Sequence, residues 1–114
     1  MNIRSAKQKG RRLCERIRQI MLDAAMTLSP DDIIVNTASN NGEDLLLSQA
    51  ARRVFPVCIE AKNQERIDIW SAIAQAENHA AGTVHTPIVV FSRNRSGDYV
   101  VCNAREFFKL MGGQ

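Results

Sequence analysis

A chain of 114 residues has the length of one domain and can bury a hydrophobic core without crosslinks from disulfides or metals. Its residues are 45% hydrophobic and 24% charged, close to the averages for folded proteins, which argues against a disordered chain. The apolar runs are too short to cross a bilayer, and the basic N-terminus lacks the apolar segment of a signal peptide, so we expect a cytoplasmic protein without a membrane partner.

The three cysteines stand far apart and inside apolar patterns, at Cys14, Cys58 and Cys102. An odd number without C-x-x-C pairs predicts neither a zinc site nor a disulfide framework. We therefore expect buried free thiols.

Positive charge is concentrated in the first eighteen residues. They hold seven of the 15 basic residues and one acid, Glu15, which leaves eight basic and eleven acidic residues in the remainder. The seven are Arg4, Lys7, Lys9, Arg11, Arg12, Arg16 and Arg18. Such a block suits a polyanion partner such as DNA, because attraction to phosphates supplies most nonspecific nucleic-acid affinity. The alternative is a solvated, partly disordered tail.

The N-terminal segment changes character at Arg11. Residues 1–10 lack hydrophobic periodicity and are predicted to be a flexible basic arm, followed by a single domain at residues 11–114. Apolar residues then recur at helical spacing, which predicts a helix over about residues 11–27. Opposite its apolar stripe lie three charged residues that we expect to face solvent or a ligand, namely Arg11, Glu15 and Arg18.

The remainder of the chain alternates strands and helices. Three strands are predicted at residues 31–37, 44–48 and 57–62, with a turn at residues 39–42 and a loop at residues 49–53 between them. A helix at residues 68–81 leads to two more strands and a last helix, at residues 88–91, 99–102 and 104–111. We expect the last helix to bring Phe107, Phe108 and Leu110 to the core. The order α-β-β-β-α-β-β-α predicts an α/β fold with a mixed β-sheet flanked by helices.

The third predicted strand becomes charged where it ends. Alternate residues of a strand share a face, so Glu60 and Lys62 point the same way, and Asp44 joins them at one edge if the second and third strands are neighbours. Two carboxylates held together repel each other, and a divalent cation is the obvious counter-charge. Oxygen ligands with room for water are what Mg²⁺ prefers. Lys62 is then free to pair with a phosphate or to help deprotonate an attacking water.

Asp44, followed sixteen residues later by Glu60-Ala61-Lys62, resembles the signature of the PD-(D/E)XK nuclease superfamily, whose core is a helix, a three-stranded meander, a helix and a strand. Further segments are similar to small endonucleases of phages and prophages, at residues 42–44, 51–56, 59–65, 69–70, 75–77 and 91–95. Together these segments span most of the chain from Lys9 onward.

This resemblance implies a restriction-endonuclease-like core and a Mg²⁺- or Mn²⁺-dependent DNA endonuclease of phage or prophage origin in a prokaryotic host cell. It implies Asp44, Glu60 and the carbonyl of Ala61 as metal ligands, Lys62 as the catalytic lysine, and Gln75 as a helix residue that faces the site. The catalytic set predicted from the sequence is therefore Asp44, Glu60, Lys62 and Gln75.

The chain departs from the superfamily pattern before the first acid, where a Pro-Asp pair is expected. Pro30-Asp31 matches by letters, but this pair precedes the first predicted strand. We therefore prefer Asp44 as the first catalytic acid. Its neighbour Glu43 points to the opposite face of the strand and is expected to be solvated.

Several residues keep two interpretations. Branched-DNA resolvases of the superfamily often add a glutamate from the first helix, so Glu15 is either a further metal ligand or an intrahelical partner of a neighbouring arginine. Trp70 either stacks on a base or packs in the fold, which is the commoner outcome. His79 and His85 share no metal-ligand spacing with a third ligand and are expected to be surface or hydrogen-bonded histidines.

Phosphate contacts are predicted for a set of basic residues, with solvation as the alternative. The set consists of Lys9, Arg11, Arg12, Arg18, Arg93 and Arg95. The adjacent pair Arg52 and Arg53 is expected to be solvated.

The leading hypothesis is a metal-dependent endonuclease that hydrolyses DNA phosphodiester bonds, with branched DNA such as a Holliday junction as the most specific substrate. A chain without a separate recognition domain suits recognition of DNA shape, and a homodimer would supply the two active sites needed to cut paired strands. The alternatives are a catalytically inactive nucleic-acid-binding module of the same fold and a structural, partner-binding α/β protein.

Overall fold

Helix α1 (Ile3–Ala24) is the longest element of the computed structural model, which describes residues 3–38 and 42–113. Its buried side chains include Leu13, Ile17 and Met21, which share one face at helical spacing. The helix begins at Ile3 and not near residue 11, so its predicted start is wrong, whereas the flexibility of the basic segment stays a prediction. Lysine, glutamine and alanine favour helix in this segment even though it has no apolar stripe.

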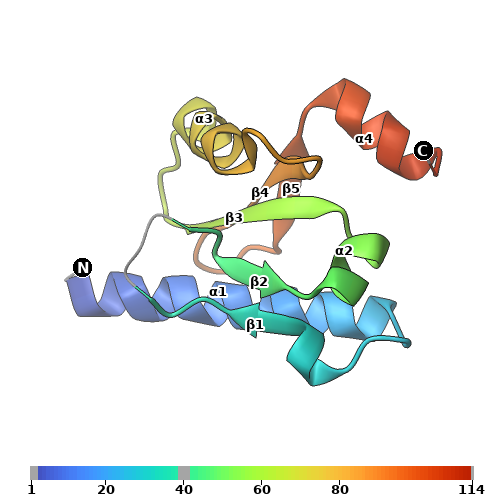
Figure 1. Cartoon of the computed structure of the whole chain (residues 1–114). Coiled ribbons are helices and arrows are strands. Elements are labelled where there is room, and N and C mark those ends of the chain that lie inside the picture. Colours follow the sequence, from blue (N-terminus) through green and yellow to red (C-terminus); the bar gives the residue numbers. More distant parts are fainter. Residues whose placement is uncertain (1–2, 39–41, 114) are drawn as a thin grey trace.

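The strands form two sheets (Figure 1). Strands β1 (Ile33–Val35) and β2 (Leu45–Leu47) make an antiparallel pair in which Ile33 is opposite Leu47. The predicted turn between them lies at residues 39–42, and residues 39–41 are outside the described residues. Strands β3 (Val57–Asn63), β4 (Thr86–Ser92) and β5 (Tyr99–Cys102) make a sheet in that order.

The second sheet is mixed, because β3 and β4 are parallel and β4 and β5 are antiparallel. The predicted α/β fold with a mixed sheet and flanking helices is therefore confirmed. The expectation that the second and third strands are regular neighbours needs correction. No ladder joins β2 to β3 in the part of the chain that the structure describes, and the Asp44 N–H instead donates to the Ile59 carbonyl at 3.3 Å.

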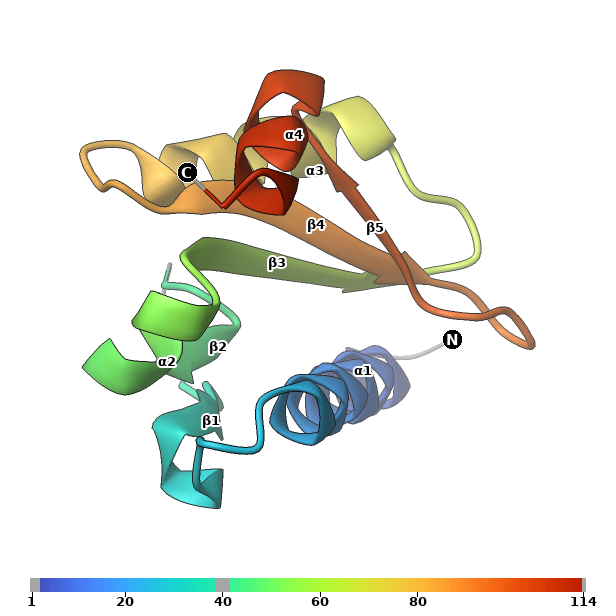
Figure 2. The ribbon, with the colours of Figure 1, turned by 90° about the vertical axis from the view of Figure 1, so that its right-hand side faces the viewer.

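Helices cover both faces of the larger sheet. Helix α1 packs against one face of β3, and helix α3 (Ile69–Ala80) covers β3 and β4 from the other side (Figure 2). Asp68 begins α3, since its carboxylate accepts a hydrogen bond from the Ser71 N–H at 3.1 Å. Helix α4 (Ala104–Met111) follows β5. None of the helices in the described ranges combines the length and the apolar character needed to cross a membrane.

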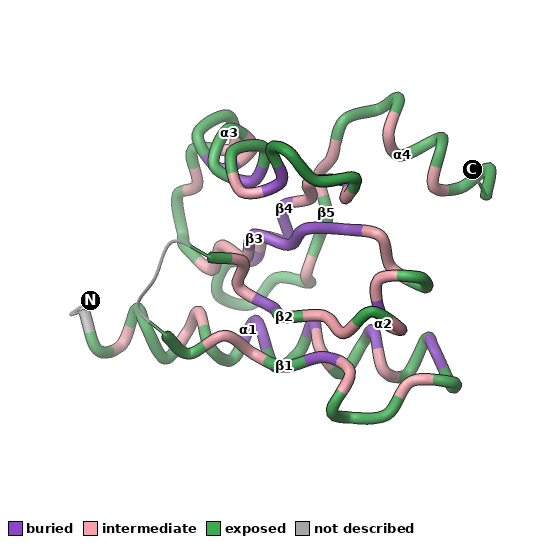
Figure 3. The backbone as a smooth tube through the Cα atoms, viewed as in Figure 1, coloured by how far each residue is buried: buried purple, intermediate pink, exposed green. Residues whose placement is uncertain are grey.

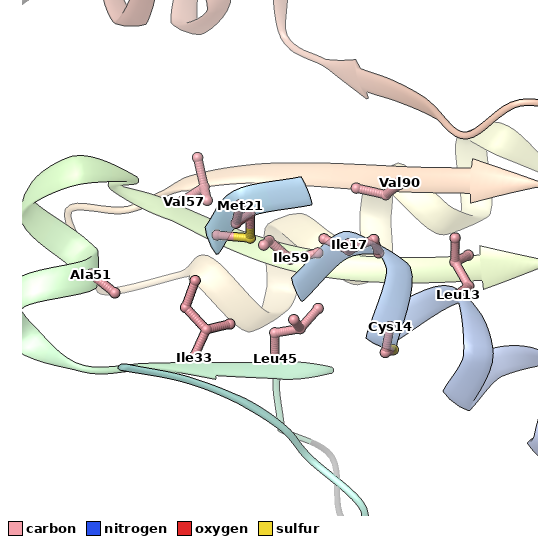
Figure 4. Close-up of a cluster of buried hydrophobic side chains, with 10 residues drawn as sticks. All are labelled: Leu13, Cys14, Ile17, Met21, Ile33, Leu45, Ala51, Val57, Ile59 and Val90. Atoms are coloured by element: carbon pink, nitrogen blue, oxygen red, sulfur yellow. The ribbon is translucent and has the colours of Figure 1, made fainter. Parts of the chain in front are cut away.

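The core has two parts, one on each face of β3 and β4. The larger part lies between α1, the β1–β2 pair and β3, and includes Leu13, Ile17, Ile33, Leu45 and Ile59 (Figure 4). The smaller part lies under α3, where Ala72 and Ala76 meet Val89. Buried residues accordingly concentrate along β3 and on the inner face of α1 (Figure 3).

Residues 49–53 were predicted as a loop but belong to helix α2 (Gln49–Val54). Ser48 caps this helix, because its Oγ accepts a hydrogen bond from the Ala51 N–H at 3.1 Å. A 3-10 helix (Pro30–Asp32) likewise precedes β1. Both helices are too short to show an apolar period, so their capping residues are the signal from which the sequence could predict them.

Helix α4 and Trp70 are less buried than predicted. Phe107 is 44% exposed and Phe108 is 70% exposed, and their rings contact each other edge to face, while Leu110 packs against the core. The side chain of Trp70 is 80% exposed on α3. Helix α4 itself was predicted correctly at residues 104–111. How deeply its side chains are buried depends on the angle between α4 and the sheet, which a local sequence pattern does not determine.

Arg18 has a structural role that the sequence did not indicate. Its Nε donates to the Ile33 carbonyl at 2.5 Å and its Nη2 donates to the Pro30 carbonyl at 2.6 Å. The guanidinium therefore fixes α1 to the start of β1, and it does not face a ligand.

Replacement of Arg18 tests this role. Arg18→Met keeps the aliphatic stem but leaves two backbone carbonyls without their donor, which should lower the free energy of unfolding by about 1–3 kcal/mol. The control Arg11→Met changes an exposed arginine of the same helix and should stay within about 0.5 kcal/mol of the wild type. Urea unfolding of both variants makes the comparison, and equal stability would contradict the assignment.

Candidate functional site

Asp44 is held beside β3 by its backbone and by its side chain. Its carbonyl accepts a hydrogen bond from the Asn36 N–H at 3.0 Å, and its own N–H donates to the Ile59 carbonyl. The carboxylate Oδ2 accepts from the Ala61 N–H at 2.7 Å. Asp44 therefore lies at the edge of β3, directly beside Glu60-Ala61-Lys62, which is the arrangement expected if the second and third strands are neighbours.

Glu60 is the most buried charged residue of this group, with 4% of its surface exposed. Its Oε1 lies 3.6 Å from Nζ of Lys62, so the two side chains share a face of β3 as expected. Its Oε2 lies 3.0 Å from Nδ1 of His79 on α3, without the alignment of a full hydrogen bond. Glu60 is thus placed between two nitrogen groups from two elements.

The two carboxylates share a poorly solvated place and influence each other. Burial raises the pKa of Glu60 above its ordinary value, and the negative charge of Asp44 raises it further. Burial also raises the pKa of Asp44, against the opposing effects of the Ala61 N–H and of the charges of Lys62 and His79. Lys62 and His79 compensate the two carboxylates only in part, because the pKa of each carboxyl is still raised, and a bound cation would relieve the remaining repulsion.

The available ligands suit an open site for Mg²⁺ or Mn²⁺, completed by water, better than a site in which protein side chains supply every ligand. Among the described residues, no three histidine, cysteine, aspartate or glutamate side chains gather closely enough to hold a metal by themselves. Mg²⁺ is commonly held by one or two carboxylates and completes its shell with water and substrate phosphates. Asp44 and Glu60 supply two carboxylates, and the Ala61 carbonyl lies on the same strand edge as the Ala61 N–H.

His79 is the site residue that the sequence interpretation missed. It was expected to be a surface or hydrogen-bonded histidine, whereas in the structure it contacts Glu60. Gln75, which was expected to face the site, lies on α3 one helical turn before His79, and its side chain is exposed. The two residues are four positions apart and share a side of α3, so helical spacing from Gln75 could have identified His79. Glu15 is exposed on α1, and its role at the metal stays a prediction.

Glu43 and Arg52, both expected to be solvated, instead form a half-buried ion pair. Nη2 of Arg52 lies 2.5 Å from Oε2 of Glu43, and Nη1 of Arg52 donates to the Val57 carbonyl. This pair fixes the residue before Asp44 to both α2 and β3. Burial, together with the nearby Glu43 carboxylate, raises the pKa of Cys58 to about 12. The thiol is therefore protonated at neutral pH.

All three cysteines are free, as predicted. Cys14 and Cys58 are buried, and Cys102 is half-buried. Burial is the main cause that raises the pKa of Cys14 to about 12, so this thiol is also protonated at neutral pH.

A hollow of about 330 Å³ opens beside Asp44, between α1 and the end of β1. Lys7 and Arg11 line it from α1, and Asp44 and Ala61 line it from the opposite side. Glu60 and Lys62 lie on the α3 side of β3, so the candidate site wraps around the open strand edge. Two cations in the hollow would attract an anionic substrate to the wall that Asp44 forms.

The predicted phosphate-binding residues separate into three groups. Arg11 lines the hollow beside Asp44. Lys9, Arg12, Arg93 and Arg95 gather around a second hollow, between α1 and the turn from β4 to β5. Arg18, bonded to two carbonyls, belongs to neither group.

Comparison with protein-family models, with curated proteins and with solved structures finds no match to this chain. Asp44, Glu60 and Lys62 therefore indicate a function only through their pattern in the sequence and through the geometry that brings them to one strand edge.

The raised pKa of Asp44 gives a test by pH. Because the folded protein binds this proton more tightly than the unfolded chain, the stabilising contribution is complete below about pH 4 and is lost as the pH rises through the folded pKa. Asp44→Asn removes that loss while keeping an acceptor for the Ala61 N–H. In EDTA, the free energy of unfolding of Asp44→Asn should therefore rise relative to that of the wild type between about pH 4 and pH 7.

Urea unfolding at several pH values measures this difference. The control Asp31→Asn changes an exposed carboxylate outside the site and should leave the difference flat across the same range. A constant or shrinking advantage of Asp44→Asn with rising pH would contradict the electrostatic picture of the site.

Proposed function

We propose that this protein is a Mg²⁺- or Mn²⁺-dependent DNA endonuclease that hydrolyses phosphodiester bonds at the edge of β3. The observation that carries the proposal is the Asp44 carboxylate bound to the Ala61 N–H at 2.7 Å, next to a buried Glu60 that lies 3.6 Å from Lys62. The restriction-endonuclease-like core belongs to the same proposal. The succession of α1, three strands, α3 and β4 supports it.

Each residue has a defined task in this proposal. Asp44 and Glu60 hold the cation, and the carbonyl of Ala61 is available at the same edge. When bound, the cation supplies a Lewis acid that polarises the phosphodiester and lowers the pKa of its water. Lys62 places a positive charge beside Glu60, where it can pair with phosphate oxygens as negative charge develops on them. His79 contacts the other oxygen of Glu60 and orients this carboxylate.

Lys7 and Arg11 would bring the substrate to the site. Both line the hollow that has Asp44 in its wall, and both come from the helix that carries most of the N-terminal positive charge. A phosphodiester that enters this hollow lies against Asp44 and within the field of two cations. The dimensions of the hollow, about 330 Å³, suit part of a nucleotide strand more than a whole duplex.

Branched DNA is the more specific substrate that we propose. The described fold has no second domain or helix set apart for reading base edges, so recognition by DNA shape is the economical mode. Cutting two strands of a junction requires two sites, and a homodimer supplies them. Native mass measurements should then give two chains per four-way junction, and one chain per junction would contradict this part of the proposal.

Cleavage assays test the nuclease itself. The wild type should cut linear, nicked, single-stranded or four-way-junction DNA with Mg²⁺ or Mn²⁺ and not in EDTA. Lys62→Ala should lower the rate by about 10²- to 10³-fold, because it removes charge stabilisation of the transition state. Lys109→Ala, an exposed lysine on α4, is the matched control and should cut at the wild-type rate.

Absence of any metal-dependent cut above the Lys62→Ala level would overturn the proposal. The alternative is an inactive nucleic-acid-binding module of the same fold. That module would bind DNA with a strong dependence on salt but with no effect of EDTA or of Asp44→Asn. The two functions are thus separated by one cleavage series and one binding series.

A further inference from the structure

A second hollow, of about 300 Å³, lies between α1 and the turn that joins β4 to β5. All of the residues that line it are basic or uncharged polar residues. Five are cationic, namely Lys9, Arg12, Arg16, Arg93 and Arg95. They come from two segments that are about eighty positions apart in the chain, so the fold itself assembles this concentration of charge.

Hydrogen bonds between α1 and the rest of the fold fix both walls of the hollow. Asn63, at the end of β3, donates its Nδ2 hydrogen to the Lys9 carbonyl at 3.1 Å, which ties α1 to the sheet. Arg16 binds Asp98 through two hydrogen bonds of 2.9 and 3.0 Å, which ties α1 to the start of β5. The hollow is therefore a preformed part of the fold, and its shape does not depend on a ligand.

Four of the five cations have no acidic partner among the described residues and can therefore pair with a ligand. Asp98 compensates Arg16, whereas no ion pair within the described residues involves Lys9, Arg12, Arg93 or Arg95. Like charges gathered at one place repel each other, and a bound anion relieves that repulsion. Arginine side chains suit phosphate in particular, because the guanidinium donates two hydrogen bonds in a planar fork.

The second hollow adjoins the first one along β3. Ala61 lines the hollow beside Asp44, and Asn63 lines the second hollow. Two residues of a strand span about 6.6 Å, so the two hollows are close enough to contact nearby phosphates of one nucleic-acid strand. Lys7 and Arg11 line one flank of α1, and Lys9, Arg12 and Arg16 line the other. One nucleic-acid strand that crosses the N-terminal half of α1 therefore reaches both hollows.

We propose that the second hollow binds a backbone phosphate of the DNA strand that is cut, a few nucleotides from the scissile bond. The assignment of DNA as the ligand rests on the proposed function, but this phosphate site needs no metal. Binding through the hollow is therefore present in EDTA and does not depend on Lys62. Because the contact is to the backbone, it is also independent of base sequence.

Arg95 makes a clean test possible. Its φ is +63°, a left-handed conformation that glycine adopts without steric cost. Arg95→Gly therefore removes a cation from the hollow without steric strain in the turn, and thermal unfolding separates a loss of binding from a loss of folding. We combine it with Arg93→Ala. The matched control is Arg53→Ala with Arg105→Ala, which removes the same charge from exposed positions on α2 and α4, at the other end of β3 (Figure 1).

Fluorescence anisotropy with a labelled oligonucleotide in EDTA, between about 50 and about 200 mM salt, provides the measurement. The Arg93→Ala/Arg95→Gly variant should bind about tenfold more weakly at the lower salt. Its plot of log K against log salt should also be less steep, with a slope smaller in magnitude by about 1. The control pair should change Kd by less than about twofold and leave the slope unchanged. Thermal unfolding should show no loss of stability on Arg95→Gly.

Unchanged binding by the hollow variant, or an equal loss in the control pair, would overturn this inference even if the protein cuts DNA. A loss that appears only with Mg²⁺ present would overturn it as well. Conversely, DNA binding with the predicted slopes but no cleavage by the wild type would support the phosphate site and reject the nuclease. If both hold, the hollow variant should raise the KM for cleavage and leave kcat close to that of the wild type.

Discussion

The hydrogen bond from the Ala61 N–H to the Asp44 carboxylate joins the two halves of this molecule. β1 and β2 form one small sheet, and β3, β4 and β5 form another, without a ladder between β2 and β3. Asp44 replaces that ladder with one backbone hydrogen bond to Ile59 and one side-chain hydrogen bond to Ala61. The contact places a carboxylate beside Glu60, and the remaining features of the candidate site follow from that placement.

Helix α1 connects the same two halves from below the sheet. Arg18 binds carbonyls at the start of β1, whereas Arg16 binds Asp98 and the Lys9 carbonyl accepts from Asn63. Part of the N-terminal positive charge thus holds the fold together, and part lines two hollows. The net charge of a segment does not distinguish these uses, because the partner of each arginine depends on tertiary structure.

Much of the fold could be predicted from the sequence because it depends on local patterns. The period of α3, the apolar run of β4 and the turn before β5 correctly gave the element types. The failures have physical causes. Residues 3–10 form helix without an apolar stripe, and α2 is a helix too short for a period. Trp70 and Phe108 are exposed because packing depends on how whole elements are placed.

The site was predictable to a similar degree. The period of a strand places Glu60 and Lys62 together, and spacing along the chain suggested Asp44. The contact of His79 with Glu60 depends on the position of α3 relative to β3, which the sequence does not contain, and the pairing of Glu43 with Arg52 likewise depends on tertiary structure. Residues on one element were thus identified from the sequence, whereas contacts between elements were not.

The seam between the two sheets also determines how the molecule should open. Few hydrogen bonds cross it at Asp44, whereas β3 and β4 pair along seven residues each. Amide hydrogen exchange in the β1–β2 pair should therefore be faster than in β3 and β4, through local opening that leaves the larger sheet intact. Such opening carries Asp44 away from Glu60. An ion bound by both carboxylates would slow it, so the exchange rate of one hairpin would report occupancy of the site.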